Sequence, residues 1–162
     1  MFTPNEVIFS ATSACNLHCS HCFVSRNPDK LDISTAITFL KSCKDYENST
    51  ASHNANPIKI EKIGFSGGEP FLYIDFLTQV IKAAVEMDFM FDQIMTNGDW
   101  WQDTQDLTQK LQLIYDAGYD GKIGLSWDSF HNQNTQRILT FITTVQQIFG
   151  PDSLNIQTVI PY

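Results

Sequence analysis

Short, β-rich apolar runs alternate with longer stretches of helical periodicity from one end of this 162-residue chain to the other. A strand–helix–strand repeat favours right-handed crossovers, which place successive strands parallel in one sheet. The length suits one domain with a sizeable core. We therefore predict an α/β fold with a parallel sheet of about five strands. The expected strands are residues 7–9, 58–66, 91–96, 123–126 and 154–160, the expected helices are 34–46, 74–87, 103–117 and 135–149, and the polar segment 47–57 is expected to be an irregular connection.

The polar motifs of the chain come directly after four of the predicted strands. A loop with three cysteines follows the first strand, Gly-Gly-Glu-Pro (67–70) the second, Thr-Asn-Gly (96–98) the third and Ser-Trp-Asp (126–128) the fourth. Because the carboxyl ends of parallel strands meet at one edge of a sheet, these four loops are expected to build one site.

Three cysteines, Cys15, Cys19 and Cys22, lie within eight positions and have the spacing C-x3-C-x2-C. Three thiolates on one short loop can hold three irons of a 4Fe–4S cluster and leave the fourth iron without a protein ligand. A catalytic site requires such an open metal position, because a substrate must coordinate there. The spacing therefore predicts an iron–sulfur site with a free coordination position.

Two other metal sites are compatible with these residues. A structural zinc ion could be bound by the three cysteines together with His18 or His21. A ferredoxin-type electron carrier would need a fourth cysteine, for which Cys43 is the sole candidate in the sequence. Cys43 lies on the apolar stripe of a predicted helix, so we expect it to be a buried, inert core thiol.

The cysteine spacing after the first strand resembles that of the radical S-adenosylmethionine (SAM) superfamily, and Gly-Gly-Glu-Pro at 67–70 matches the second motif of that family. The resemblance runs along essentially the whole chain. It implies a partial (β/α) barrel of the radical SAM type. It also implies that Cys15, Cys19 and Cys22 bind the 4Fe–4S cluster, while SAM chelates the fourth iron through its amino and carboxylate groups.

The same resemblance implies a binding segment for the amino group of SAM. Gly67, Gly68 and Glu69 correspond to this segment, in which residues without a Cβ let the backbone approach a ligand and a carboxylate accepts from an ammonium. His21 occupies the position where the family places a ring near the adenine. The alternative for His21 is a loop residue that makes backbone contacts alone.

Further side chains fall where the family surrounds the ribose and carboxylate of SAM, namely those of Thr96, Asn97, Ser126 and Asp128. Taken alone, Asn97 belongs to an ordinary turn, and Asp128 is a helix-capping or solvated residue. His131 follows at the same rim, either as a substrate contact or as a solvated loop histidine.

The reaction implied by the resemblance begins when the reduced cluster gives one electron to SAM, which breaks into methionine and a 5′-deoxyadenosyl radical. That radical abstracts hydrogen from a substrate that the sequence does not identify: a peptide, a protein or a small molecule. The electron is expected to come from a flavodoxin or ferredoxin. The alternative is a non-catalytic iron–sulfur module for electron transfer or scaffolding, or an inactive truncated fragment.

The chain departs from the family pattern at its C-terminal end. Radical SAM barrels usually have six strands, whereas five are predicted here and the chain ends at Tyr162. We expect residues 1–162 to form a radical SAM core domain that lacks the last strand and any C-terminal domain. The fifth strand also lacks the glycine-rich motif that many members use near the adenine.

Composition and charge argue against other classes of function. The formal net charge of −8 disfavours sequence-independent binding to nucleic acid, whose phosphates it would repel. No apolar run approaches the ~20 residues that span a bilayer, so no membrane association is expected. Residues 1–10 lack the basic and apolar regions of a signal peptide. The expected location is therefore the cytoplasm, where clustered cysteines serve as metal ligands rather than in disulfides.

Overall fold

Five parallel strands form one sheet in the computed structural model, which describes residues 4–25, 27–50 and 59–159. Each strand pairs in parallel with the next one along the chain, so the order in the sheet is the order in the sequence. The predicted α/β fold with a parallel sheet is confirmed. The strands are β1 (Glu6–Ser10), β2 (Lys62–Ser66), β3 (Met90–Thr96), β4 (Lys122–Ser126) and β5 (Leu154–Gln157).

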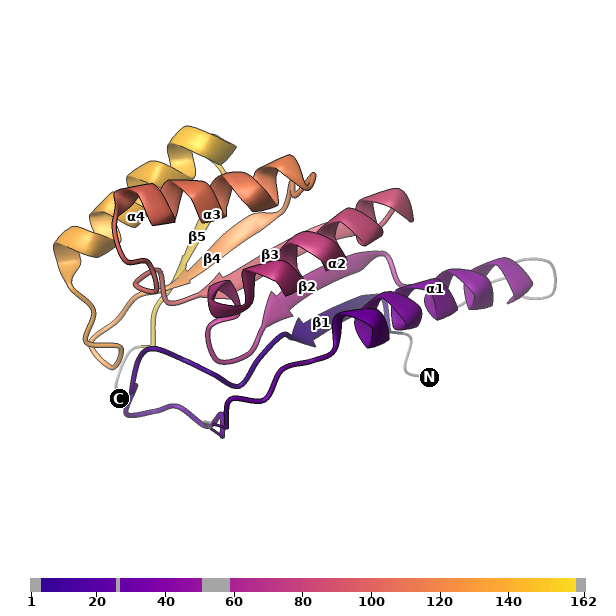
Figure 1. The fold of residues 1–162 in the computed structure, drawn as a ribbon, viewed down its shortest axis with the longest axis horizontal. Helices are drawn as coiled ribbons and strands as arrows, with labels where there is room; N and C mark the ends of the chain where they lie inside the picture. The colour runs from indigo at the N-terminus through magenta and orange to yellow at the C-terminus, as the bar shows by residue number, and fades with distance from the viewer. Residues whose placement is uncertain (1–3, 26, 51–58, 160–162) are drawn as a thin grey trace.

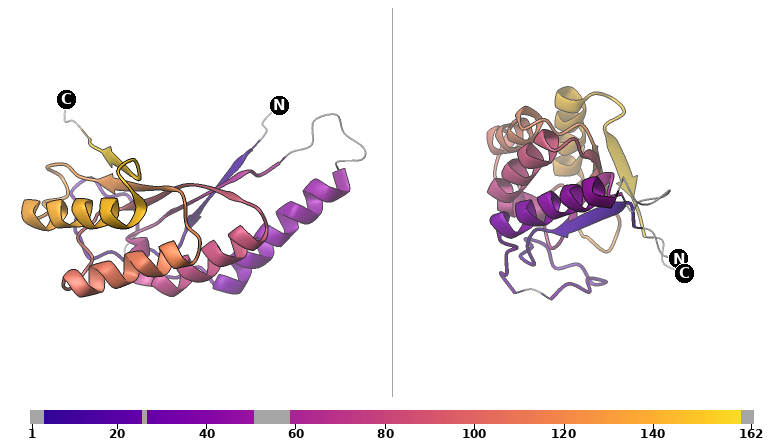
Figure 2. Two further views of the ribbon diagram at one scale, coloured as in Figure 1. Left: turned by 90° about the horizontal axis from the view of Figure 1, so that it is seen from above. Right: turned by 90° about the vertical axis from the view of Figure 1, so that its right-hand side faces the viewer.

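The α-helices that connect these strands lie together on one face of the sheet (Figures 1 and 2). Right-handed crossovers between neighbouring strands always return on the same side, whereas a doubly wound sheet reverses its strand order and has helices on both faces. This arrangement is that of a partial (β/α) barrel. Among the described helices, none is both long and apolar enough to cross a membrane. They are α1 (Ile33–Thr50), α2 (Ile74–Glu86), α3 (Thr104–Asp116) and α4 (Thr135–Phe149), and a short 3-10 helix, η1 (Pro70–Tyr73), precedes α2.

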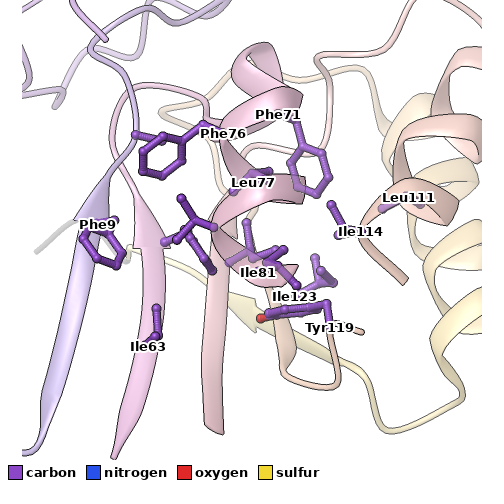
Figure 3. Packing of buried hydrophobic residues seen from close by; sticks show 14 of the residues in the cluster. Phe9, Ile63, Phe71, Phe76, Leu77, Ile81, Leu111, Ile114, Tyr119 and Ile123 are labelled. Carbon is purple, nitrogen blue, oxygen red and sulfur yellow. The ribbon is translucent and has the colours of Figure 1, made fainter. Parts of the chain in front are cut away.

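The hydrophobic core lies between the sheet and the helices (Figure 3). Side chains alternate between the two faces along each strand, and those that face the helices, such as Ile63 and Ile123, are fully buried. They pack with Leu77 and Ile81, which recur on one side of α2. On the opposite face of the sheet, Ile8 of β1 is 61 % exposed. The helices therefore cover one face of the sheet and leave the other accessible.

Most predicted elements agree with the observed ones. The three helices predicted after residue 70 correspond to α2, α3 and α4, and the strands β1, β3 and β4 begin and end within one residue of the prediction. The strand predicted at 58–66 is shorter, because β2 starts at Lys62, and the one predicted at 154–160 ends at Gln157. Residues 58 and 160 lie outside the described ranges.

The irregular connection predicted from residue 47 onward is wrong for residues 47–50, because α1 continues to Thr50. Lys44 and Glu47 form an ion pair one turn apart, with 3.7 Å between Nζ and Oε2. The Ser49 hydroxyl donates to the carbonyl of Tyr46 at 2.9 Å. These contacts stabilise the last turns, so the polar composition there does not end the helix. Residues 51–57 lie outside the described part of the chain.

Cys43 is less buried than its position on the apolar stripe of α1 predicts. The residue is half-buried at the edge of the core. Its side chain lines a shallow surface hollow together with Phe39, Tyr46 and Ile60. Burial nevertheless raises the pKa of the thiol, which therefore stays protonated near neutral pH.

Candidate functional site

The cysteine loop, residues 11–25, packs closely against the loop that follows β2. The amide of Gly68 donates to the carbonyl of Thr12 at 2.7 Å, and the amide of Glu69 donates to the carbonyl of Ala14 at 2.8 Å. A Cβ on Gly68 would lie 2.1 Å from the Ala14 oxygen, and a Cβ on Gly67, whose φ is +134°, would lie 2.4 Å from the Thr12 oxygen. The glycine pair is therefore required for contact with the backbone of the cysteine loop, independently of any ligand.

The three cysteines of the loop line one cavity of about 250 Å³. Cys22 is exposed, whereas Cys15 and Cys19 are half-buried, and burial raises the pKa of both of these thiols. In the described residues, no three His, Cys, Asp or Glu side chains converge closely enough to hold one metal ion. The ligands of a zinc ion would each lie ~2.3 Å from the metal, whereas the thiolates around a cubane bind different irons and stand further apart.

The loops after β2, β3 and β4 complete the wall of this cavity. The wall includes five further residues that the sequence predicts for the site, which are His21, Gly67, Gly68, Asn97 and Ser126. His131 lines it as well, as does Thr96. The cavity is also lined by residues that no sequence motif had indicated, which are Ser13, Phe23, Val24, Ser66 and Met95. Two of these, Ser66 and Met95, immediately precede the second and third motifs in the sequence. Their position beside a motif could have indicated that they belong to the same site.

Glu69 is fully buried and is not among the residues that line the cavity. Its Oε1 accepts from the amide of Phe71 at 3.1 Å and from the hydroxyl of Thr96 at 2.9 Å, and its Oε2 accepts from the amide of Asn97 at 2.8 Å. Burial raises the pKa of the carboxyl group to about 7, although the three donors favour the ionised form. Glu69 therefore joins the loop after β2 to the loop after β3, and its contact with SAM stays a prediction.

Asp128 is also bonded to neighbouring groups rather than placed in the cavity wall. Its carboxylate lies 2.7 Å from His131 Nδ1 and accepts from the amides of Phe130 at 2.9 Å and Val159 at 3.2 Å. Burial opposes ionisation of Asp128, but these hydrogen bonds outweigh it and hold the pKa of the carboxyl group below its usual range. They also orient His131, whose ring centroid lies 4.9 Å from that of His21 on the cysteine loop. The contact with ribose or carboxylate predicted for Asp128 is not tested by this arrangement.

Two buried tryptophans support the loop after β3, although neither belongs to a predicted motif. Trp100 stacks on Phe71 with 4.4 Å between ring centroids, and its indole N–H donates to Thr96 Oγ1 at 3.0 Å. The indole N–H of Trp101 donates to the carbonyl of Gly98 at 3.0 Å. These contacts fix the turn that carries Asn-Gly at the cavity. Two adjacent tryptophans directly after a turn were the signal in the sequence.

Comparisons with known proteins identify the family. A family model described as a 4Fe–4S single cluster domain matches residues 6–139, which include all three cysteines of the loop. The chain is 30 % identical over 139 residues to the GTP 3′,8-cyclase of Chlorobaculum tepidum. It is 33 % identical over 128 residues to an S-adenosylmethionine-dependent nucleotide dehydratase of Fibrobacter sp. (strain UWH6). The chain belongs to the radical SAM superfamily.

The radical SAM family predicted from the cysteine spacing and the Gly-Gly-Glu-Pro motif is thus confirmed, and with it the cofactors of that family, a 4Fe–4S cluster and SAM. The two matches cover 81 % and 78 % of this chain, but 35 % and 34 % of the relatives. The chain therefore spans about a third of the length of the curated relatives that it matches.

Proposed function

We propose that this radical SAM chain binds a 4Fe–4S cluster on Cys15, Cys19 and Cys22 and cleaves SAM reductively. The observation that carries the proposal is the shared cavity, whose wall contains the three thiols and residues of the loops after β2, β3 and β4. The match to a single-cluster family model supports the cluster. The Fibrobacter relative is an S-adenosylmethionine-dependent enzyme by name, which supports SAM as the second cofactor.

The other cavity residues are proposed to surround SAM. Gly67 and Gly68 can present their backbone to its amino group, and Ser126 can offer a hydroxyl to its ribose or carboxylate, since all three line the cavity. The ring of His21 is proposed to lie beside the adenine. In this proposal Glu69 acts by holding the rim together, because both of its carboxylate oxygens already accept hydrogen bonds within the protein.

When bound, the cluster would supply one electron for the cleavage of SAM, and SAM would supply the group that abstracts hydrogen from the substrate. The chain itself orients the cofactors and excludes water and unwanted hydrogen donors. Apolar side chains suit this second task, and Val24 and Met95 line the cavity that the thiols share.

We further propose a nucleotide-like small molecule as the substrate class, rather than the peptide or protein considered from the sequence. The two relatives are named for reactions of GTP and of a nucleotide, and neither name points to a peptide. His131 gives this proposal a candidate contact, because it lines the cavity while Asp128 fixes its orientation. An imidazole in that position can donate a hydrogen bond to a phosphate or to a base.

The external electron donor is proposed to be a flavodoxin or ferredoxin of the cytoplasm. Such a donor must come close to the cluster, and the part of the cysteine loop around Cys22 is accessible from outside. Cys22 is exposed, and the neighbouring Phe23 is 96 % exposed.

The test of the proposed function is anaerobic reconstitution of the full chain with iron and sulfide, followed by dithionite and SAM. We expect about four irons per chain by metal analysis, and 5′-deoxyadenosine by chromatography. Cys19→Ala should produce no 5′-deoxyadenosine. Cys43→Ala is the matched control, because Cys43 lies on α1 and not in the cavity wall, so it should keep wild-type cluster content and product.

Three results would contradict the proposal in different ways. A tetrahedral zinc ion in deoxygenated protein would exclude the cluster. A stable cluster that never cleaves SAM would favour the non-catalytic iron–sulfur module. Consumption of a peptide, with no consumption of any nucleotide in a panel that includes GTP and CTP, would overturn the substrate class alone.

A further inference from the structure

We propose that the side-chain amide of Asn97 donates a hydrogen bond to the Cys15 thiolate and thereby sets the reduction potential of the cluster. This inference rests on the proposed function, because it needs a cluster at Cys15. It gives Asn97 a role different from the contact with SAM that its position in the family implies. Asn97 would be a positioning and tuning residue that acts through a ligand.

The contact itself is direct. Nδ2 of Asn97 lies 3.7 Å from Sγ of Cys15, within reach of a hydrogen bond to the large sulfur atom, and 3.0 Å from Oδ1 of Asn16. The amide carries two hydrogens, so it can serve both acceptors at once. Asn97 is 7 % exposed, which keeps this donor out of bulk water.

Neighbouring groups fix which end of the Asn97 amide faces the sulfur. The backbone N–H of Asp99 lies 2.8 Å from Oδ1 of Asn97, and a donor at that place requires the carbonyl end of the amide. Nδ2 of Asn16 donates to the carbonyl of Asp99 at 3.0 Å. Asn16, Asn97 and Asp99 thus form a closed set of hydrogen bonds, which we call the amide clasp. Within the clasp, the amide end of Asn97 points to Cys15.

The backbone of Asn97 is held as firmly as its side chain. Its N–H donates to Oε2 of the buried Glu69 at 2.8 Å, and its carbonyl accepts from Nε2 of Gln133. Gln133 also donates to the carbonyl of Ser126 at 2.8 Å. Every polar atom of Asn97 therefore has a partner, and these partners lie on different loops. A residue held in this way can keep a donor at a fixed place while the cluster changes its charge.

Hydrogen bonds to ligand sulfurs raise the reduction potential of an iron–sulfur cluster, because they stabilise the more negative, reduced form. Cys15 receives two such bonds, from Asn97 and from the backbone N–H of Leu17 at 3.5 Å. In the described part of the chain, Cys19 and Cys22 receive no bond from a side chain outside the cysteine loop. The hydrogen bonds that raise the reduction potential of the cluster would therefore act on one ligand, Cys15.

The test compares three variants of the full chain, each reconstituted anaerobically and titrated potentiometrically with detection by electron paramagnetic resonance. Asn97→Ala removes the donor without adding charge, and we expect its midpoint potential to be more negative than that of wild type. Asn97→Asp has the same size but replaces the donor by an acceptor, so its potential should fall further. Asn16→Ala is the comparison, because it opens the amide clasp but leaves the Asn97 donor; its potential should shift much less than that of Asn97→Ala.

A spectroscopic signature gives an independent readout. Electron–nuclear double resonance of the reduced cluster should show an exchangeable proton coupling that disappears on transfer to deuterium oxide. The coupling from the Asn97 amide should be present in wild type and in Asn16→Ala and absent in Asn97→Ala, whereas the coupling from the Leu17 N–H should remain in all three. If Asn97 only stabilised the loops, its removal would not abolish the coupling of one proton while the cluster stayed intact.

The inference is overturned if Asn97→Ala has wild-type iron content and a wild-type potential, or if Asn16→Ala shifts the potential as much as Asn97→Ala does. If Asn97→Ala takes up no iron, the isosteric Asn97→Asp variant decides. If both Asn97 variants stay empty while Asn16→Ala assembles a cluster, Asn97 serves assembly, and the tuning role is overturned. A wild-type chain that assembles no cluster contradicts the proposed function instead.

Discussion

The two halves of the cysteine loop differ in how the fold holds them. Residues 11–17 are bonded to several other segments: Ala11 to Ser66, Ser13 to Asp29, Thr12 and Ala14 to the amides of Gly68 and Glu69, and Asn16 to Asp99. Residues 18–25 have one backbone hydrogen bond in the described part of the chain, from Cys22 to Cys19, together with the ring contacts of His21. The folded chain thus places Cys15 in advance, whereas Cys22 is exposed.

This difference suggests that the two halves would serve a bound cluster differently, the first by positioning it and the second by leaving it accessible. A ligand that is fixed before the metal arrives lowers the cost of assembly and defines where the cluster lies. A loose second half can close over the irons afterwards, and it leaves one side accessible to an electron donor. Substitutions in and around the loop can test whether these hydrogen bonds hold residues 11–17, and whether residues 18–25 contribute little to the stability of the fold.

The largest effect is expected at Gly68, where the two backbones meet. Gly68→Ala would place a Cβ 2.1 Å from the Ala14 oxygen, an impossible distance, so the cysteine loop must move away from the loop after β2. We expect the free energy of unfolding to fall by about 3 kcal/mol or more, at the upper end of overpacking costs. Urea denaturation of the iron-free chain under reductant measures this, and cluster uptake should fall with it.

The matched control for that variant is Gly64→Ala on β2. Its Cβ would meet its nearest neighbours at 3.4 Å, an ordinary contact, and we expect the stability to change by less than ~1 kcal/mol. Equal losses in the two variants would show that the close approach at Gly68 is not what holds the first half of the loop.

The second effect concerns Glu69 and the dependence of stability on pH. Its pKa is raised by burial from the usual value near 4.5 to about 7 in the folded chain. Between these values the folded state binds the proton more tightly than the unfolded state, so stability must fall as pH rises and then level off above pH 7. The loss corresponds to about 3 kcal/mol. Urea denaturation at a series of pH values should show it.

Glu69→Gln provides the comparison for this pH series, because the amide cannot ionise. The difference in unfolding free energy between wild type and variant should therefore shrink or reverse between pH 4.5 and pH 7, in proportion to the charge on the buried carboxyl group. Parallel curves over that range would mean that Glu69 titrates alike in both states, so that its three hydrogen-bond donors offset the effect of burial and the pKa is not raised.

Local patterns were sufficient to predict the elements of this fold. Periodicity and stop signals are carried by neighbouring residues, so the strands and helices around the core follow from the sequence, and motifs placed after parallel strands must gather at one edge. The three cysteines, the glycine pair and Ser126 accordingly meet in one cavity.

The partners of individual side chains could not be predicted in the same way. The bond between Glu69 and the amide of Asn97 joins residues 28 positions apart, and the bond between Asn97 and Cys15 joins residues 82 apart. Such contacts depend on the spacing of adjacent strands and on loop shape, which no local pattern encodes. The glycine pair was interpreted as room for a ligand, and only the structure shows that the backbone of Thr12 and Ala14 lies where the two Cβ atoms would be.

A third, smaller effect is expected at Arg137 of α4, which supports the clasp from outside. Its guanidinium lies over the ring of Trp101, at 3.7 Å from the centroid, and it donates to Asp99 and to the Trp101 carbonyl. Arg137→Lys keeps the charge but loses the planar fork and the stacking. We expect a loss of about 1 kcal/mol in unfolding free energy, since the site is only partly buried. Full recovery of stability by lysine would show that charge alone matters there.

The smallest effect is expected in the second half of the loop, at Phe23, which is 96 % exposed. Phe23→Ser removes a large apolar group that buries almost nothing against the described chain, so stability should change by less than ~0.5 kcal/mol. Iron uptake and the cluster potential should also stay at wild-type values, because Phe23 neither donates to a thiol nor anchors the loop. Loss of stability comparable to that of Gly68→Ala would show that the second half is as tightly integrated as the first. A selective fall in the rate of reduction by flavodoxin, with dithionite reduction unchanged, would instead show that the exposed half serves the electron donor.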